Sequence, residues 1–365
     1  MRVLMLSTDA SILESASESQ SRMKDYGTLA ERLDIIVCTV SPHREFAISD
    51  RVRAIPTNSR SKLWYVLDML RIAKQSINGT VDVVTAQDPF ETGLAGWLIR
   101  RRLKSKLQLQ VHTDFLSPYF GRMSFKNFIR VNIAKRLLPK ADSIRVVSER
   151  IKRSLVDLGL PEEKIAVLPI FVSLVPNEAP EIDLHKKYSQ FETIVFMASR
   201  LEPEKNISLA IRAFADVARA NSKIGLVIAG SGSEQKHLEQ LVAMYQLQDS
   251  VVFEGFVRNL AQYFASADIF LNTSNYEGYG RTLIEAAVAG LPIITTDVGL
   301  VGEIINQENS IVVPVGDGNA LTEAMLRLVA DEAVRAQLGA VARSVVLQLP
   351  DKEALLERQK QLWQM

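Results

Sequence analysis

Short hydrophobic segments alternate with segments of helical period along almost the whole chain, and this alternation limits the fold more than any other feature. In the first half the strand-like segments are RVLMLS, LDIIVCTV, VDVVTAQ, KLQLQVHTD and SIRVVS. In the second half they are TIVFMASR, KIGLVIAG, VVFEGF, DIFLNTS, PIITTD and SIVVPVG. Strands separated by helices form parallel, doubly wound sheets, so the sequence predicts an α/β protein.

The alternation stops once, in LPIFVSLVPNEAPEIDLHKKYSQFE, where three prolines interrupt a stretch of weak periodicity. We therefore predict two Rossmann-like domains, over residues 1–172 and 192–348, joined by a linker over residues 173–191. The last segment, 349–365, is polar and amphipathic and predicts a C-terminal helix.

Charge is divided unequally between the two halves. Residues 1–190 hold 29 lysines and arginines against 21 acidic residues, whereas residues 191–365 hold 14 against 21. Residues 100–153 alone hold 15 basic residues against 3 acidic ones. The first domain is therefore expected to face an anionic partner. No nucleic-acid-binding motif accompanies this charge, so we do not expect nucleic acid to be that partner.

Within this basic region, RMSFKNFIRVNIAKRLLPK interleaves Phe125, Phe128, Ile129 and Ile133 with basic residues. Two interpretations stay open. The helix either rests on an anionic membrane surface, where lipid-linked acceptors are found, or packs its apolar side into the domain.

Cysteine content and hydropathy indicate the compartment. The chain has one cysteine, Cys38, so it cannot form an internal disulfide framework and suits a reducing compartment. No apolar run reaches about 18 residues, and MRVLMLSTDA is typical of a first strand rather than of a signal peptide. We expect a cytoplasmic protein, with peripheral binding to the inner face of the membrane as an open alternative.

The stretch NYEGYGRTLIEAAVAG follows the strand-like DIFLNTS. Gly278 and Gly280 allow backbone N–H groups to approach a ligand closely, and a helix is predicted to begin at about Arg281. A helix N-terminus favours an anion such as a diphosphate, and the carboxylates of Glu277 and Glu285 can accept hydrogen bonds from vicinal hydroxyls. The alternative is a surface helix with two solvated glutamates.

Polar residues also follow other predicted strands. Arg200 and Lys205, in FMASRLEPEKNISLAI, are two cations able to neutralise a diphosphate, unless they pair with neighbouring glutamates on the surface. His112 and Asp114 lie in QVHTDF, and Asp88 lies in AQDPF. For His112 a purely structural role is the alternative, and for Asp88 it is capping of the following helix.

Together, SRLEPEKN, LVIAGSGSE, VVFEGFV, ADIFLNTSNYEGYGRTLIEAAVAGLPIITTDVG and GEII resemble the donor domain of family-4 retaining glycosyltransferases of the GT-B fold (glycosyl transferases group 1). The first half resembles the same family more loosely, through AQDPFETGLAGWL and LQLQVHTDFLSPYF. The resemblance implies two Rossmann-like domains that face across a cleft, with a C-terminal helix that returns to the N-terminal domain. It also implies retaining transfer of a hexosyl unit from a nucleotide-diphosphate sugar to a hydroxyl of a glycan or lipid-linked acceptor.

The resemblance implies roles at the matching positions. Arg200 and Lys205 are expected to hold the donor diphosphate, Glu277 the donor sugar and Glu285 the ribose, and His112 is expected near the reacting carbon. The other expected donor contacts are Gly278, Tyr279, Gly280 and Arg281, with Phe256 and Val257 near the base. Asp88 and Asp114 are expected on the acceptor side.

Some features depart from the family or leave alternatives. The loop Thr8–Arg22 contains no glycine, where many relatives carry a Gly-Gly pair, so either small residues substitute there or the acceptor site is reshaped. No Asp-x-Asp triplet occurs, so we expect neither a required metal nor another cofactor.

A nucleotide-sugar 2-epimerase of the same fold and a non-catalytic nucleotide-sugar-binding protein remain alternatives. A dinucleotide oxidoreductase is disfavoured, since no G-x-G-x-x-G follows the first strand.

Overall fold

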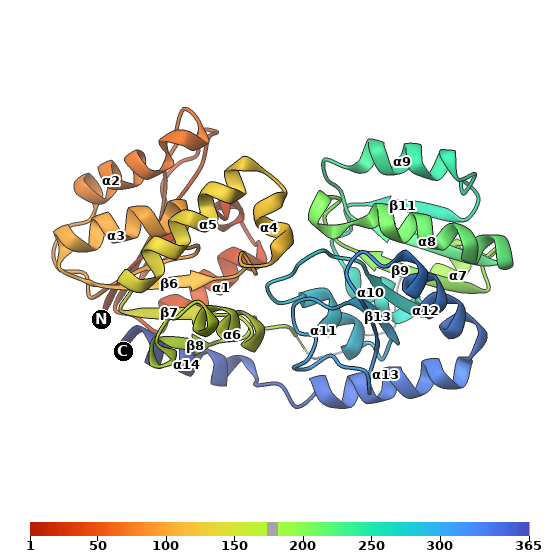
Figure 1. The fold of residues 1–365 in the computed structure, drawn as a ribbon. Helices are drawn as coiled ribbons and strands as arrows, with labels where there is room; N and C mark the ends of the chain where they lie inside the picture. The colour runs from red at the N-terminus through yellow and green to blue at the C-terminus, as the bar shows by residue number, and fades with distance from the viewer. Residues whose placement is uncertain (174–181, 365) are drawn as a thin grey trace. The chain divides into compact units, whose positions relative to one another are not determined.

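A computed structural model describes residues 1–173 and 182–364, which form two compact units (Figure 1). The first unit is Met1–Phe171 together with the segment from Pro350 onward, and the second is Val172–Leu349. Each unit is built on a largely parallel sheet with helices, so the predicted α/β class is confirmed.

The first unit holds an eight-stranded sheet in the order β3-β4-β2-β1-β5-β6-β7-β8, and only the β3–β4 pair is antiparallel among its described strands. The strands are β1 (Arg2–Ser7), β2 (Arg32–Val37), β3 (Phe46–Ser49), β4 (Val52–Pro56), β5 (Val83–Ala86), β6 (Lys106–Val111), β7 (Ser143–Val146) and β8 (Ile165–Val167). The helices of this unit are α1 (Glu18–Gly27), α2 (Tyr65–Ser76), α3 (Glu91–Leu103), α4 (Pro118–Arg122), α5 (Phe125–Leu137), α6 (Glu149–Asp157) and α14 (Lys352–Gln364).

The second unit holds a six-stranded, all-parallel sheet in the order β11-β10-β9-β12-β13-β14. Its strands are β9 (Thr193–Ala198), β10 (Ile224–Ala229), β11 (Val251–Gly255), β12 (Ile269–Asn272), β13 (Ile293–Thr296) and β14 (Ile311–Val313). Its helices are α7 (Leu184–Lys187), α8 (Ile207–Ala220), α9 (Gln235–Met244), α10 (Leu260–Ser266), α11 (Arg281–Val288), α12 (Gly318–Ala330) and α13 (Glu332–Val346).

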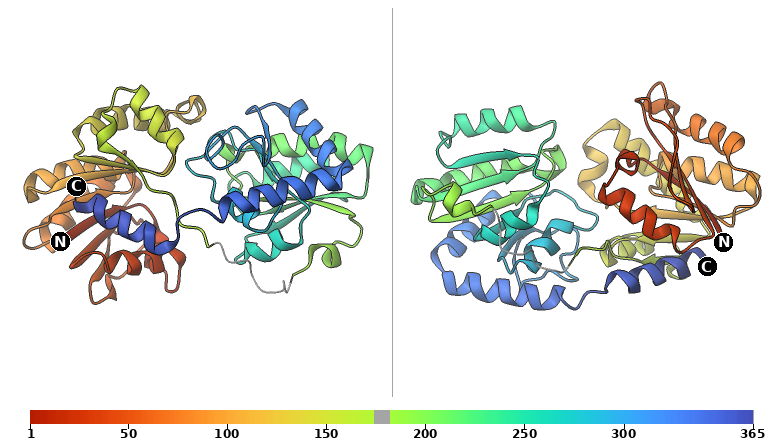
Figure 2. Two further views of the ribbon diagram at one scale, coloured as in Figure 1. Left: turned by 90° about the horizontal axis from the view of Figure 1, so that it is seen from below. Right: turned by 180° about the vertical axis from the view of Figure 1, so that it is seen from behind.

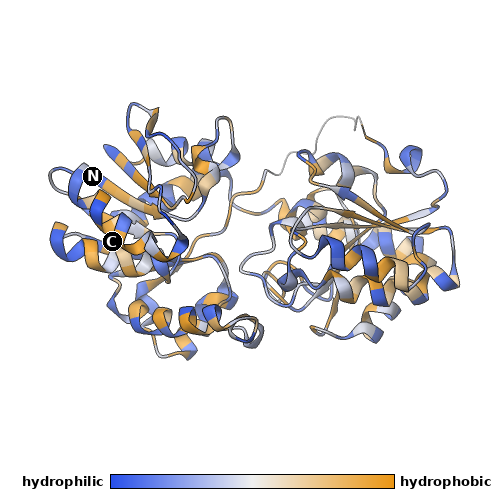
Figure 3. Ribbon diagram, turned by 90° about the horizontal axis from the view of Figure 1, so that it is seen from above, coloured by the Kyte–Doolittle hydropathy of each residue, from blue (hydrophilic) through white to orange (hydrophobic). Residues whose placement is uncertain are grey.

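Both faces of the second sheet are covered, as the continuous hydrophobicity of its strands predicts. Side chains alternate along β9, so Val195 joins a cluster with α8, α9 and α12. Phe196 joins an aromatic group on the other side, where it stacks on Tyr263 and meets Phe264 edge to face. Figure 3 shows the strands mainly in hydrophobic colours, whereas the helices carry both colours.

The last helix returns to the first unit, as the family resemblance implies. Trp363 in α14 is 1% exposed and joins the core cluster of β1, β2 and α1. Its ring meets Tyr26 of α1 edge to face, with 5.8 Å between the centroids. Figure 2 shows α14 beside the elements that begin the chain. The first unit is therefore assembled from both ends of the sequence.

The boundaries of the units can be compared with the predicted domains. Of the predicted linker, residues 174–181 lie outside the described residues. From residue 182 the chain packs with the second unit, because Leu184 is fully buried and Lys187 forms an ion pair with Glu254 at 2.7 Å. The structured second unit thus begins before residue 192. Within the described part of the chain, no helix has both the length and the apolar composition needed to span a membrane.

Candidate active site

Loops at the carboxyl ends of β9 and β12 bring cations and carboxylates of the second unit together. Arg200 follows β9, is 71% exposed and forms an ion pair with Glu204 at 2.7 Å. This pairing with a neighbouring glutamate is the one that the sequence left open as an alternative. An exposed ion pair contributes little stability, so the Arg200 guanidinium can exchange this partner for another anion at small cost.

Lys205 and Glu277 form a second ion pair, between the loop after β9 and the loop after β12. Both side chains are 15% exposed, so the pair is largely withdrawn from solvent. Ser274 Oγ lies 2.8 Å from Glu277 Oε1 and adds a polar neighbour. The structure thus brings together two predicted site residues that lie 72 positions apart.

The main chain around this pair is held by further bonds. Thr273 Oγ1 donates to the carbonyl oxygens of Lys205 and Asn206, at 2.9 and 3.1 Å. The backbone N–H of Asn275 donates to the carbonyl of Glu204 at 2.8 Å. Because both loops are fixed to each other, the Lys205–Glu277 pair has a defined place at the end of the sheet.

The glycine loop after Glu277 is also tightly enclosed. Tyr279 is 4% exposed, and burial, with a smaller contribution from Glu303, raises its pKa to about 12. Gly280 has φ of 90° and directly precedes α11, a conformation that suits glycine. A Cβ on Gly299 would approach the Tyr279 carbonyl oxygen to 2.5 Å, so the neighbouring loop packs directly on this backbone. Gly278 lies within the same loop.

Helix α11 carries two predicted donor residues, Arg281 at its start and Glu285 one turn further on. Arg281 Nε donates to Glu285 Oε1 at 2.8 Å, and Glu285 is 19% exposed. Glu285 therefore lies in the helix that the glycine loop opens, as the sequence indicated. The remaining donor candidates follow β11, where the Phe256 side chain is 74% exposed and Val257 comes next.

The first-unit candidates follow β5 and β6. Asp88 Oδ1 accepts from the backbone N–H of Phe90 at 2.7 Å and of Thr92 at 3.3 Å, so this carboxylate caps the start of α3, the alternative named above. Burial raises the pKa of Asp88 and also that of Asp114. Near Asp114, His112 Nε2 lies 2.9 Å from Gln110 Oε1. Burial, then the positive charges of Arg145 and Arg22, lowers the His112 pKa to about 3, so this imidazole is neutral at ordinary pH.

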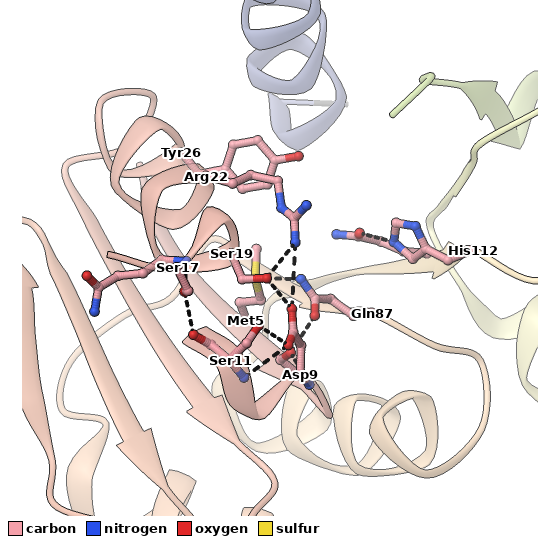
Figure 4. Close-up of polar contacts among 12 residues, drawn as sticks. Met5, Asp9, Ser11, Ser17, Ser19, Arg22, Tyr26, Gln87 and His112 are labelled. Carbon is pink, nitrogen blue, oxygen red and sulfur yellow. Dashed lines mark hydrogen bonds and ion pairs between the residues drawn. The ribbon is translucent and has the colours of Figure 1, made fainter. Parts of the chain in front are cut away.

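The glycine-free segment Thr8–Arg22, expected as a loop, includes the start of α1 at Glu18 and is organised by Asp9 (Figure 4). Asp9 Oδ1 accepts from the backbone N–H of Ser11 at 3.1 Å, and Asp9 Oδ2 accepts from the Ser19 hydroxyl at 2.6 Å. The Arg22 guanidinium reaches the same carboxylate at 3.7 Å and is 41% exposed. A turn capped by Asp9, and Arg22 of α1, thus occupy the segment in which many relatives carry glycines.

Two buried glutamines lie beside His112 and were not predicted from the sequence. Gln108 and Gln110 share one face of β6 with His112, and both glutamine side chains are 1% exposed. The alternation in QLQVH was a usable signal, since polar residues two apart on a central strand point to one face. The Lys205–Glu277 contact had no such signal, because only the fold brings these two segments together.

Cations, carboxylates and a helix N-terminus at the carboxyl edge of a parallel sheet are typical of nucleotide-binding α/β domains. Comparisons with known proteins identify the family. Residues 182–345 match the family model of glycosyl transferases group 1, and residues 27–175 match that of glycosyltransferase family 4. The chain belongs to the family-4 glycosyltransferases of the GT-B fold.

Relatives and solved structures agree with this assignment. The chain is 32% identical over 239 residues to the alpha-monoglucosyldiacylglycerol synthase of Streptococcus pneumoniae, an alignment that covers 62% of this chain and 53% of that protein. The chain thus spans about half the length of this relative. Sucrose-phosphate synthase from Thermosynechococcus elongatus has a TM-score of 0.84 at 22% identity, covering 100% of this chain and 98% of that one. Anabaena HepE in complex with UDP-glucose has a TM-score of 0.78 at 19% identity over 100% of both chains. These two structures establish the shared fold.

Proposed function

We propose that this protein is a retaining glycosyltransferase that moves a hexosyl unit from a nucleotide-diphosphate sugar to an acceptor hydroxyl. The observation that carries this proposal is the Lys205–Glu277 pair beside the glycine loop and the N-terminus of α11. Together they supply a cation and helix N–H groups for a diphosphate and a carboxylate for sugar hydroxyls.

The chemistry follows from where charge develops. As the bond between the sugar and the diphosphate breaks, negative charge grows on the leaving diphosphate, and Arg200, Lys205 and the start of α11 stabilise it. Glu277 holds hydroxyls of the donor sugar, and Glu285 holds those of the ribose. The leaving phosphate takes the proton of the acceptor hydroxyl on the same face of the sugar, so the anomeric configuration is retained. We propose that no divalent metal or other cofactor is needed, since the chain lacks an Asp-x-Asp triplet.

The named relatives suggest substrate classes to test first. One solved neighbour contains UDP-glucose, and one relative is named for glucosyl transfer to a diacylglycerol lipid. We propose a nucleotide-activated hexose, with uridine diphosphate as the first candidate carrier, and a glycan or lipid-linked acceptor. We propose a cell-envelope glycan as the product class, because another relative, 26% identical over 225 residues, is named as a capsular polysaccharide biosynthesis glycosyltransferase of Staphylococcus aureus. The same names support a transferase over a 2-epimerase or a non-catalytic binding protein.

Donor binding can be tested by thermal denaturation with UDP-, GDP- and ADP-sugars. At a concentration 100 times Kd, a ligand that binds only the folded state stabilises it by about 2.7 kcal/mol. We expect one nucleotide class to raise the melting temperature, and Glu285→Gln to remove this rise. The matched control is Glu323→Gln on α12, which exchanges an exposed glutamate away from these loops. If no nucleotide sugar shifts the transition and Glu285→Gln behaves like the control, the donor site is wrongly assigned.

The first part of α5 supports a peripheral membrane contact at the cytoplasmic face. Phe125 and Phe128 are 78% and 57% exposed and stack on each other, and Ile129 is 43% exposed. Only Ala134 and Leu137, towards the end of α5, are buried among its described residues. The basic residues of region 100–153 complement an anionic bilayer.

If α5 contacts the membrane, the protein should co-sediment with anionic vesicles of phosphatidylglycerol. Salt should weaken this binding, and the double variant Phe125→Ser/Phe128→Ser should lose it. Met244→Ser is a control, because Met244 is 75% exposed on the second unit. Equal binding to neutral and anionic vesicles, or binding unaffected by the double substitution, would argue against the membrane contact.

A further inference from the structure

The face of β6 that carries His112 is covered by polar side chains and by α14. Gln108 lies opposite Thr85 of β5 in the strand register, and Gln110 lies opposite Arg145 of β7. These four side chains are at most 5% exposed. Most buried hydrogen-bond donors face an acceptor, so the direction of each bond is restricted by its neighbours, although Arg145 Nε and Gln359 Nε2 lack an acceptor among the described residues.

Three successive hydrogen bonds lead from α14 to Gln110, and the donor in each can be deduced by starting from α14. The Leu362 carbonyl oxygen can only accept, so the bond of 3.1 Å that it makes fixes the side-chain NH₂ of Gln108 as the donor. Gln108 Oε1 then accepts from the Thr85 hydroxyl at 3.0 Å. Because the Thr85 proton is used in this bond, Thr85 Oγ1 accepts from Gln110 Nε2 at 2.8 Å.

Gln110 Oε1 is consequently the atom that faces His112 Nε2, at 2.9 Å. An amide oxygen only accepts, so the proton on the neutral imidazole must be on Nε2.

The contact with Arg145 gives the same orientation of the Gln110 amide independently. The Arg145 guanidinium can only donate, and its Nη1 lies 3.3 Å from Gln110 Oε1 and 2.8 Å from Oε1 of Gln359 in α14. If the Gln110 amide were turned over, its NH₂ would face the Arg145 guanidinium, which can only donate. The cation of Arg145 also opposes a second proton on His112.

We propose that α14, through Gln108, Thr85 and Gln110, fixes His112 as the neutral tautomer protonated on Nε2, so that Nδ1 is a hydrogen-bond acceptor only. The consequence for catalysis rests on the proposed function. In that function, His112 accepts a hydrogen bond from a sugar hydroxyl and does not donate a proton. Gln108, Thr85 and Gln110 act as positioning residues. The C-terminal helix thereby contributes to the position of His112 through the Leu362 carbonyl oxygen.

The test is the ¹⁵N spectrum of the full-length protein with labelled histidine, with the His112 signals identified by their loss in His112→Asn. We expect Nε2 to show the protonated, pyrrole-type signal and Nδ1 the unprotonated, pyridine-type signal at neutral pH. The opposite pattern, or a mixture of both tautomers, would overturn the proposal. The spectrum is recorded without any nucleotide sugar, so its outcome is independent of whether the proposed transferase activity is found.

Two variants distinguish an effect on the His112 tautomer from an effect on the stability of the protein. Thr85→Val breaks the chain of bonds, whereas Thr57→Val removes another buried hydroxyl with backbone bonds in the same unit. We expect similar losses of melting temperature from both variants, but a mixture of His112 tautomers and about a tenfold lower kcat only with Thr85→Val. A Thr85→Val protein whose tautomer and kcat match those of Thr57→Val would contradict the role of this chain.

Discussion

The Lys205–Glu277 pair is the residue-scale feature on which the donor site depends. Each side chain is mostly buried, so removing one partner leaves the other desolvated without its counter-charge. The two residues also meet between two loops, so their pairing fixes loop geometry as well as charge.

A double-mutant cycle with Lys205→Met and Glu277→Gln measures this coupling. We expect each single variant to lower the free energy of unfolding, and the double variant to lose less than the sum by about 0.5–3 kcal/mol. Urea denaturation of the four proteins gives the values. Arg200→Met is the comparison, because the exposed Arg200–Glu204 pair should contribute at most about 1 kcal/mol. Strict additivity at Lys205 and Glu277 would contradict their coupling.

His112 predicts a pH dependence of stability. Its folded-state pKa of about 3, lowered by burial, Arg145 and Arg22, lies below the ordinary value of 6.5. Between these values the unfolded chain binds a proton that the folded protein does not, so stability falls as pH falls, by up to about 1.4 kcal/mol per pH unit. Denaturation of the wild type and of His112→Gln at several pH values measures this. The difference between the two proteins should change across pH 3–6.5 and be constant above it, and a constant difference throughout would contradict the lowered pKa.

At the scale of elements, most strands were predictable from their hydrophobic runs, including the three-residue β14 in SIVVPVG, whereas β3, β4 and β8 were not predicted. β3 is a half-buried edge strand of four residues, and β8 is an edge strand of three, so neither provides a periodic signal. The loop positions of Arg200, Lys205 and Glu277 followed from strand ends. The Lys205–Glu277 pair depends on tertiary packing that spacing does not encode. The Arg200–Glu204 pair and the capping role of Asp88 are local contacts, and the sequence left both open as alternatives.

At Gly230 the loop after β10 closely approaches the loop after β9. Gly230 has φ of 144°, and a Cβ there would meet the Ser199 carbonyl oxygen at 1.8 Å, where the loops after β9 and β10 touch. We expect Gly230→Ala to destabilise the protein by about 1–3 kcal/mol more than Gly316→Ala, through overpacking against the backbone. Gly316 is the matched control, since it has φ of 84° but nothing within 4 Å of its Cβ position. Equal losses in chemical denaturation would show that the loops do not need this close approach.

At the scale of the whole molecule, each unit has its own core. Trp363 of α14 completes the core of the first unit. The identity of Trp363 as a core residue was not predictable from a polar last segment. Its burial depends on a surface formed by β1, β2 and α1, more than three hundred residues earlier in the sequence. The stability of the two units should therefore be separable.

Trp363→Ala tests this separation. Loss of this buried side chain should cost about 3–5 kcal/mol, and the loss should be confined to the first unit. Hydrogen exchange measured by mass spectrometry should show faster exchange in β1, β2 and β6 and unchanged exchange in β9 and β10. Trp64→Ala is the control, because that tryptophan is 48% exposed. Faster exchange in both units would mean that they unfold together.

Retaining transfer of the sugar can be followed at the anomeric carbon of the donor. A nucleotide hexose labelled with ¹³C at this carbon is incubated with the protein and a panel of glycan and lipid-linked acceptors, and the label is followed by NMR. We expect the label to move to an acceptor with its configuration retained, free nucleotide diphosphate to appear, and Glu277→Gln to abolish both. Appearance of a 2-epimer of the nucleotide sugar without acceptor, or no change in the label with any donor and acceptor, would contradict retaining transfer.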